Sequence, residues 1–253
     1  MTFGALSQID ILLLALIGFS TACFHSIAGF SGGLLLAIAV APFVGIKETV
    51  PTVSVAMLIS NIARVNIFRR SIDWPIYLTI NAVALPFVVL GIFMYLRMPT
   101  HYVAMFLGVF LMTMVPARWW LEGQRVRVSL KSLGVIAVPY GFLSGTSFGV
   151  GLMLAPFLLG AGLAGEALVA TAAATGLSLN LTKTVFFGLS PLLTAQLALI
   201  GAMIGACTIP GHYLGAWIVR RTSLRVHARI VEAIIVAGAL YYIWKGFATW
   251  PAA

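Results

Sequence analysis

Residues 145–188 read GTSFGVGLMLAPFLLGAGLAGEALVATAAATGLSLNLTKTVFFG, and the spacing of glycines and apolar residues in this segment indicates the kind of fold. It opens with a glycine-rich run, and the apolar piece that follows, 149–163, is interrupted and short. A helix needs about 20 apolar residues to cross the hydrocarbon core of a bilayer. The sequence therefore predicts a half-helix or re-entrant segment at 149–163, followed by a full-length helix over 166–187.

A similar pattern occurs in the first half of the chain. A glycine cluster again leads into a short apolar piece, 29–45, and a longer apolar segment follows. Near the end of that segment the element Asn61-x-x-Arg64 corresponds to Asn180-x-x-Lys183 in the second half. The order of these features is the same in both halves, which indicates an internal duplication.

The composition of the whole chain indicates a membrane protein. Of its 253 residues, 61% are hydrophobic and only 8% are charged, whereas roughly 25% of residues are charged in a soluble domain. Long unbroken apolar runs favour helices over a barrel. The expected fold is an all-α integral membrane protein, a polytopic bundle of about 8–10 membrane segments. The segments are expected at 9–28, 29–45, 49–68, 75–96, 101–118, 132–147, 149–163, 166–187, 192–218 and 228–247.

The basic residues indicate how the two halves are oriented. Loops rich in Lys and Arg face the cytoplasm, and these loops lie near Arg70, at 118–131 and at 220–229. An even number of membrane crossings must then separate the basic loop at 118–131 from the one at 220–229. This holds if 132–147 and 149–163 count as separate crossings. Each half then has five segments, and because five is odd, the second half has the opposite orientation to the first. Inverted repeats that each contain a broken helix are typical of secondary transporters. The predicted division is a first membrane repeat at 1–121, a basic cytoplasmic linker at 122–131 and a second membrane repeat at 132–253.

Other classes of protein lack support in the sequence. The net charge of +9 comes mostly from the short basic loops, so nucleic-acid binding is not expected. No His-Glu-x-x-His, Walker or Cys-x-x-Cys element is present, which argues against a metalloprotease, an ATP-driven pump and a redox cofactor. We therefore expect no metal and no cofactor. Any transport would draw on an ion gradient or run downhill.

Three features of the chain resemble a known family. They are the paired glycine-rich stretches, the Gly-Leu-x-x-x-Ala-x-x-x-Thr run from Gly162 to Thr171, and the Asn180-x-x-Lys183 element. Over nearly the whole chain they resemble the sulfite exporter TauE/SafE family, also called toluene sulfonate uptake permeases. The resemblance implies a small integral membrane protein of two related halves that moves sulfite, a sulfonate or a related anion.

The predicted substrate site combines a fixed charge with hydrogen-bond donors. Glu166 and Lys183 are the only formally charged residues between Ser132 and Val219, and a lysine within the membrane usually faces a cavity or a partner. A broken helix exposes backbone N–H groups and a dipole that stabilise an anion. The predicted substrate-binding residues are Lys183, Asn180, Asn61, Arg64, Ser31, Ser147, Gly32, Gly33, Gly149 and Gly151.

Each of these predictions has a structural alternative. The glycines could simply let helices pack closely, and Arg64 could extend to the cytoplasmic interface. Glu48 and Glu166 fit either helix capping or proton coupling. His25 and His212 fit either hydrogen-bonded core histidines or titratable groups in a transport route.

The predicted function is a secondary transporter or permease for a small anion, sulfite or an organosulfonate by resemblance. We expect a multi-pass protein of the cell inner membrane, surrounded by the lipid bilayer. A proton or a sodium ion is the expected coupling ion, and a homo-oligomer is compatible with the sequence. One alternative is a permease for a different small anion, such as a carboxylate.

The other alternative is a rhomboid-like intramembrane serine protease. The string Gly29-Phe-Ser31-Gly32 fits the Gly-x-Ser-Gly pattern of such enzymes, and His212 could supply the base. Against it, the serine recurs at Ser147, and a duplicated nucleophile has no purpose. A membrane protein without transport activity is a third class, but it would not need the buried charge of Lys183.

Overall fold

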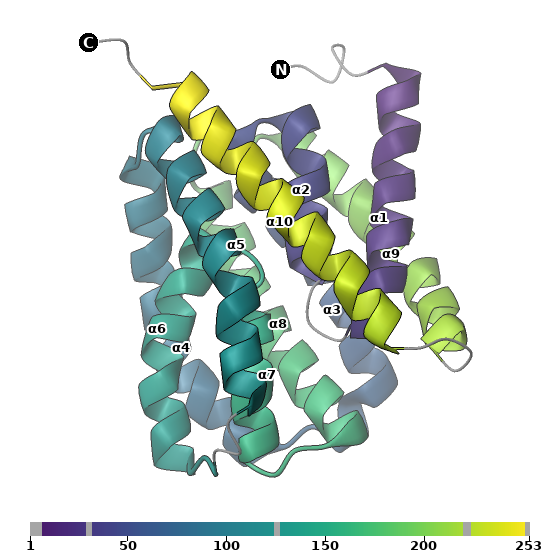
Figure 1. Cartoon of the computed structure of the whole chain (residues 1–253), viewed down its shortest axis with the longest axis vertical. Coiled ribbons are helices and arrows are strands. Elements are labelled where there is room, and N and C mark those ends of the chain that lie inside the picture. Colours follow the sequence, from purple (N-terminus) through teal and green to yellow (C-terminus); the bar gives the residue numbers. More distant parts are fainter. Residues whose placement is uncertain (1–6, 29–31, 124–126, 220–223, 251–253) are drawn as a thin grey trace.

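The computed structural model describes residues 7–28, 32–123, 127–219 and 224–250. Over these ranges the chain is a bundle of α-helices with one short 3-10 turn at Arg69–Ser71 and no strand (Figure 1). The helices are α1 (Gln8–Ala28), α2 (Gly32–Val44), α3 (Ile46–Phe68), α4 (Trp74–Arg97), α5 (Thr100–Gly123), α6 (Leu130–Thr146), α7 (Gly151–Gly160), α8 (Gly165–Gly188), α9 (Ala195–Val219) and α10 (Leu224–Ala248).

These helices confirm the all-α membrane bundle predicted from the apolar runs, and each predicted segment corresponds to one helix. The main difference lies at the predicted linker 122–131. α5 continues to Gly123 and α6 begins at Leu130, so helices occupy both ends of that stretch. Ser129 explains the start of α6, because its hydroxyl accepts a hydrogen bond from the Ser132 N–H at 3.2 Å.

Polarity is distributed as in a membrane protein. Large apolar side chains such as Leu12, Val135 and Leu199 are exposed on the outside of the bundle, while many polar side chains are buried inside it. Four helical stretches of the described chain are long and apolar enough to cross a membrane, namely Gln8–His25, Ile46–Ser71, Trp74–Arg97 and Ala195–Gly215. Shorter apolar helices lie at Gly32–Val44, Thr100–Met114 and Gly151–Gly160.

Helix packing relates the two halves of the chain. α4 packs on α6 and α9 packs on α1, while α3 contacts both α8 and α9, and α8 contacts both α3 and α4. These contacts stay the same when α1 is exchanged with α6, α3 with α8 and α4 with α9, so each helix corresponds to the one five places along the chain. Glycines permit the close approach in both copies. A Cβ atom on Gly91 would collide with the carbonyl oxygen of Phe142, and one on Gly211 would collide with that of Phe19.

Corresponding helices run in opposite directions. α3 begins beside the end of α4, where the Lys47 ammonium donates to the Leu96 carbonyl oxygen at 3.2 Å. It leads into the turn beside the start of α8, where the Ser71 hydroxyl donates to Glu166 at 3.3 Å. α8 therefore begins at the end of the bundle where α3 finishes (Figure 1). This antiparallel relation is the one that inverted repeats predict.

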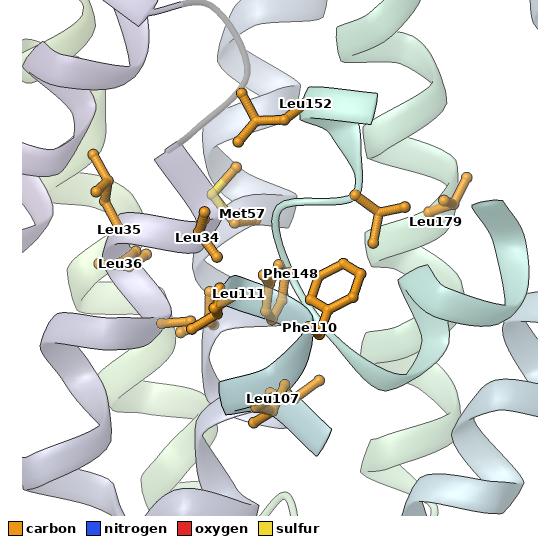
Figure 2. Close-up of a cluster of buried hydrophobic side chains, with 14 of the residues drawn as sticks. Leu34, Leu35, Leu36, Met57, Leu107, Phe110, Leu111, Phe148, Leu152 and Leu179 are labelled. Atoms are coloured by element: carbon orange, nitrogen blue, oxygen red, sulfur yellow. The ribbon is translucent and has the colours of Figure 1, made fainter. Parts of the chain in front are cut away.

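The two short helices are anchored in the core. Phe148, in the connection between α6 and α7, lies among side chains from α2, α3, α5, α7 and α8 (Figure 2). Gly149 in the same connection has φ of 93°, a conformation that favours glycine. A Cβ atom there would also lie 2.9 Å from Leu34 of α2. The break before α7 is therefore fixed both by backbone conformation and by packing.

Candidate functional site

A cavity of about 90 Å³ collects residues from both halves of the chain. It is bounded by α3 and α8, by the ends of α1 and α6, and by the starts of α2 and α7. The predicted substrate-binding residues that line it are Gly33, Asn61, Arg64, Ser147, Gly149, Gly151, Asn180 and Lys183. The fold thus brings together most of the residues that the duplicated pattern had singled out.

Lys183 is the most deeply buried charge of the cavity. Its side chain is 3% exposed, and its ammonium lies 3.7 Å from the centre of the Phe148 ring. Among the described residues the ammonium has no carboxylate and no hydrogen-bond acceptor. A cation–π contact compensates only part of the cost of removing a charge from water. The cavity therefore holds an ammonium whose hydrogen-bond donors are unused.

Asn180 lies one turn before Lys183 on α8. Its amide nitrogen donates to the Gly176 carbonyl oxygen at 2.8 Å, while its Oδ1 atom is buried and has no hydrogen-bond partner. Asn61 approaches the same point from α3, because a Cβ atom on Gly176 would lie 3.0 Å from the Asn61 amide nitrogen. Both asparagines of the repeated element thus lie beside Gly176.

The start of α7 contributes backbone donors. The hydrogen bonds of this helix begin with the Leu152 N–H, which donates to the Gly149 carbonyl oxygen at 2.9 Å. The N–H groups of Val150 and Gly151 have no acceptor in the described part of the chain, and both residues line the cavity. Free N–H groups and the positive end of the helix dipole both favour an anion at this place. The hydroxyl of Ser147 has a different role, since it donates to the Leu143 carbonyl oxygen at 2.8 Å.

Arg64 faces the interior of the bundle. Its Nη1 atom lies 2.5 Å from Nε2 of His25, and both residues line the cavity. Nδ1 of the same histidine accepts a hydrogen bond from the Gly32 N–H at 2.8 Å. Gly32 therefore contacts His25 and is not among the residues that line the main cavity. Arg64 is therefore in contact with another residue that lines the cavity.

His212 lies beside the main cavity. It hydrogen-bonds to the Ser60 hydroxyl at 2.7 Å, and its ring centre lies 5.6 Å from that of His25. A smaller void of about 10 Å³ touches both histidines. Within the residues that the structure describes, no group of three or more His, Cys, Asp or Glu side chains could hold a metal ion.

The remaining predicted residues lie elsewhere. Glu48 is in the first turn of α3, close to Gly45, and Glu166 is in the first turn of α8. Neither carboxylate lines the cavity, and both positions suit helix capping. Ser31 lies outside the described residues, as does Gly29 of the protease-like string.

Sequence reasoning missed several residues that line the cavity: Met57, Tyr140, Ser144, Phe148, Val150, Ala172, Gly176 and Leu179. Two of them carried a signal. Phe148 is the aromatic residue inside the glycine-rich break, and Gly176 precedes Asn180 by one helical turn. Tyr140 and Ser144 lie on α6 and have no counterpart in the repeated pattern.

A comparison with protein families matches residues 14–242 to the sulfite exporter TauE/SafE family. Comparisons with curated proteins and with solved structures give no match. The family match covers most of the 253 residues, and it agrees with a helical bundle that is apolar outside and has a cavity lined by cations and free donors. The chain belongs to the sulfite exporter TauE/SafE family, and it is a membrane transport protein.

Proposed function

We propose that this protein is a secondary transporter that moves a small anion, sulfite or an organosulfonate, across the cytoplasmic membrane. The observation that carries the proposal is the ammonium of Lys183, which is buried in a cavity and has no carboxylate partner among the described residues. A charge within a membrane protein is costly and typically marks a substrate pathway. An anion in the cavity would supply the missing countercharge.

The placement of the cavity suits alternating access. It lies between α3 and α8, which correspond to one another in the two halves and run antiparallel. In transporters built from inverted repeats the substrate site lies at the interface of the repeats, and movement of one against the other opens it to either side. We propose that residues 1–121 and 132–253 are these repeats.

The cavity has room for a compact substrate. About 10–15 Å³ of such cavity volume holds one water molecule, so a cavity of about 90 Å³ accommodates an anion of a few heavy atoms. Sulfite, a short alkyl sulfonate and a small carboxylate are anions of this kind.

For the coupling ion we favour a proton over sodium. Lys183 and Arg64 both line the cavity, and two cations would repel sodium there. His25 contacts Arg64 and also lines the smaller void that reaches His212. The two histidines thus extend from the anion site to the smaller void and could pass protons along this line. Imidazole is the side chain best suited to exchange protons near neutral pH.

A flux assay with purified protein in proteoliposomes tests the proposed function. Uptake of sulfite, methanesulfonate and acetate is measured for the wild type, for Lys183→Met and for protein-free vesicles. Lys245→Met is the matched control, because Lys245 lies near Trp244 on α10 and outside the cavity. We expect sulfur oxyanion flux in the wild type and in Lys245→Met, and a loss of at least about tenfold in Lys183→Met. Wild-type vesicles no more permeable than protein-free ones would contradict the proposal.

A further inference from the structure

Two cations, one from each half of the chain, line the same cavity. Arg64 belongs to α3 and Lys183 to α8. Of the Lys, Arg, Asp and Glu residues that the structure describes, these two alone line it. His25 also lines the cavity, but its ring brings no negative charge. The described wall of the cavity therefore carries two positive charges and no negative one.

The carboxylates of the chain lie elsewhere. The sequence has six Asp and Glu residues, and none of those that the structure describes lines the cavity. Glu232 accepts a hydrogen bond from the indole nitrogen of Trp119 at 2.9 Å. Four others lie at the starts of helices, namely Asp10, Glu48, Asp73 and Glu166. The described carboxylates are thus not placed to neutralise the cations of the cavity.

The two cations approach the cavity from opposite sides. α3 and α8 run antiparallel, and Asn61 of α3 lies beside Gly176 of α8. Arg64 is about one turn beyond Asn61, and Lys183 is about two turns beyond Gly176. A helical side chain leans towards the N-terminus of its helix. Each cation is therefore directed back towards the level at which Asn61 and Gly176 lie.

Both cations have donors to offer a ligand. The Lys183 ammonium has no hydrogen-bond partner in the described chain, yet it is not among the unpaired side-chain atoms that are fully enclosed there, which are Oδ1 of Asn81 and Oδ1 of Asn180. It therefore retains accessible surface, and the cavity is the space that Lys183 lines. Arg64 contacts His25 through Nη1. Its Nε and Nη2 atoms make no hydrogen bond to the described residues.

We infer that the cavity takes its ligand as a dianion. A single negative charge would compensate one cation and leave the other unpaired within the membrane, where an unpaired charge is costly. A doubly charged ligand compensates both. Such ligands include the sulfite dianion, sulfate and a short sulfonate that also carries a carboxylate. The inference rests on the proposed function and adds a charge rule to it.

Sulfate and methanesulfonate isolate this rule. Both have a tetrahedral sulfur with four substituents, and they differ in a charged oxygen against a methyl group. Near neutral pH sulfate is a dianion and methanesulfonate is a monoanion. Because the dianion loses more hydration when it enters a protein, a preference for sulfate has to come from the charges of the site.

The experiment is a calorimetric titration of the purified full-length protein with each anion. Arg97→Gln is the matched control, because Arg97 lies in the last turn of α4 and does not line the cavity. We expect the wild type and Arg97→Gln to bind sulfate at least about tenfold more tightly than methanesulfonate. We expect Arg64→Gln to lose this preference, mainly by weakening sulfate. Equal wild-type affinities, or a preference that persists in Arg64→Gln, would overturn the inference.

The wild-type ratio decides the matter even if Arg64→Gln does not fold. Sulfite is titrated alongside the two probes. A wild type that binds sulfite or methanesulfonate but not sulfate would overturn the inference alone. A wild type that binds none of the three anions would overturn the proposed function itself, and the inference with it. The two failures are therefore distinguishable.

Discussion

The ammonium of Lys183 lies against the face of the Phe148 ring, 3.7 Å from its centre. The lysine belongs to α8 and the phenylalanine to the break between α6 and α7, so this contact joins the long helix to the free N-terminus of α7. The ring stabilises the ammonium while no anion is present. An arriving anion has to compete with this contact for the same charge.

The first prediction follows from this competition. Phe148→Leu should lower the melting temperature of the anion-free protein, because it removes the cation–π contact as well as packing. The matched variant is Phe110→Leu in the same apolar cluster (Figure 2). Sulfite should raise the melting temperature of Phe148→Leu more than that of Phe110→Leu, as measured by thermal unfolding in detergent. Equal responses of the two variants would show that the ring does not compete for the ammonium.

The second prediction concerns the break before α7. Gly149 and Gly162 have similar positive φ values, 93° and 95°. Alanine at Gly162 has open space around its Cβ atom, whereas at Gly149 it would press on Leu34. Gly162→Ala should cost about 1 kcal/mol in backbone strain. Gly149→Ala should destabilise the protein more and reduce flux, which chemical denaturation and the vesicle assay measure. Equal effects would mean that packing around the break is loose.

The third prediction concerns coupling. His25→Ala should abolish uptake driven by a pH gradient but retain exchange of labelled for unlabelled anion, because the anion site keeps Lys183. His101→Ala is the control, since His101 packs against Tyr102 at the start of α5 and does not line the cavity. Gradient-driven uptake that survives in His25→Ala would exclude this histidine from the coupling step.

The fourth prediction concerns orientation. A reporter fused after Arg70 and one fused near Arg225 should both report the cytoplasm, because the basic loops lie there. A reporter near Ser190, beyond the far end of α8, should report the outside. Cytoplasmic signals from the Ser190 fusion would rule out the inverted orientation of the two halves.

The helices were predictable because the bilayer imposes a simple rule on the sequence. Apolar runs long enough to cross, and two that are too short, appear directly in the chain and match the helices of the structure. The repeated element could also be predicted from the sequence. In each copy the asparagine and the cation, Asn61 with Arg64 and Asn180 with Lys183, lie about one turn apart on one helix. These are local patterns, and local patterns survive in a single sequence.

The contacts that define the cavity were not predictable in the same way. The pairs Lys183 with Phe148 and Arg64 with His25 join residues that are far apart in the chain. Which residues of two helices face one another depends on how the helices pack, and the spacing of residues along the sequence does not reveal this packing. For Glu166 the sequence left helix capping and proton coupling open, and its place in the exposed first turn of α8, outside the cavity, suits capping.

The central claim, that Lys183 is the fixed charge of an anion site, is tested most directly by equilibrium binding. Sulfite affinity is compared between the wild type, Lys183→Ala and Lys183→Arg, each purified and shown to be folded. Lys183→Ala removes a charge-assisted hydrogen bond and should weaken binding by roughly ten- to a hundredfold. Lys183→Arg keeps the charge and should retain part of the affinity. Equal affinities of wild type and Lys183→Ala would contradict the claim and make this lysine a structural residue.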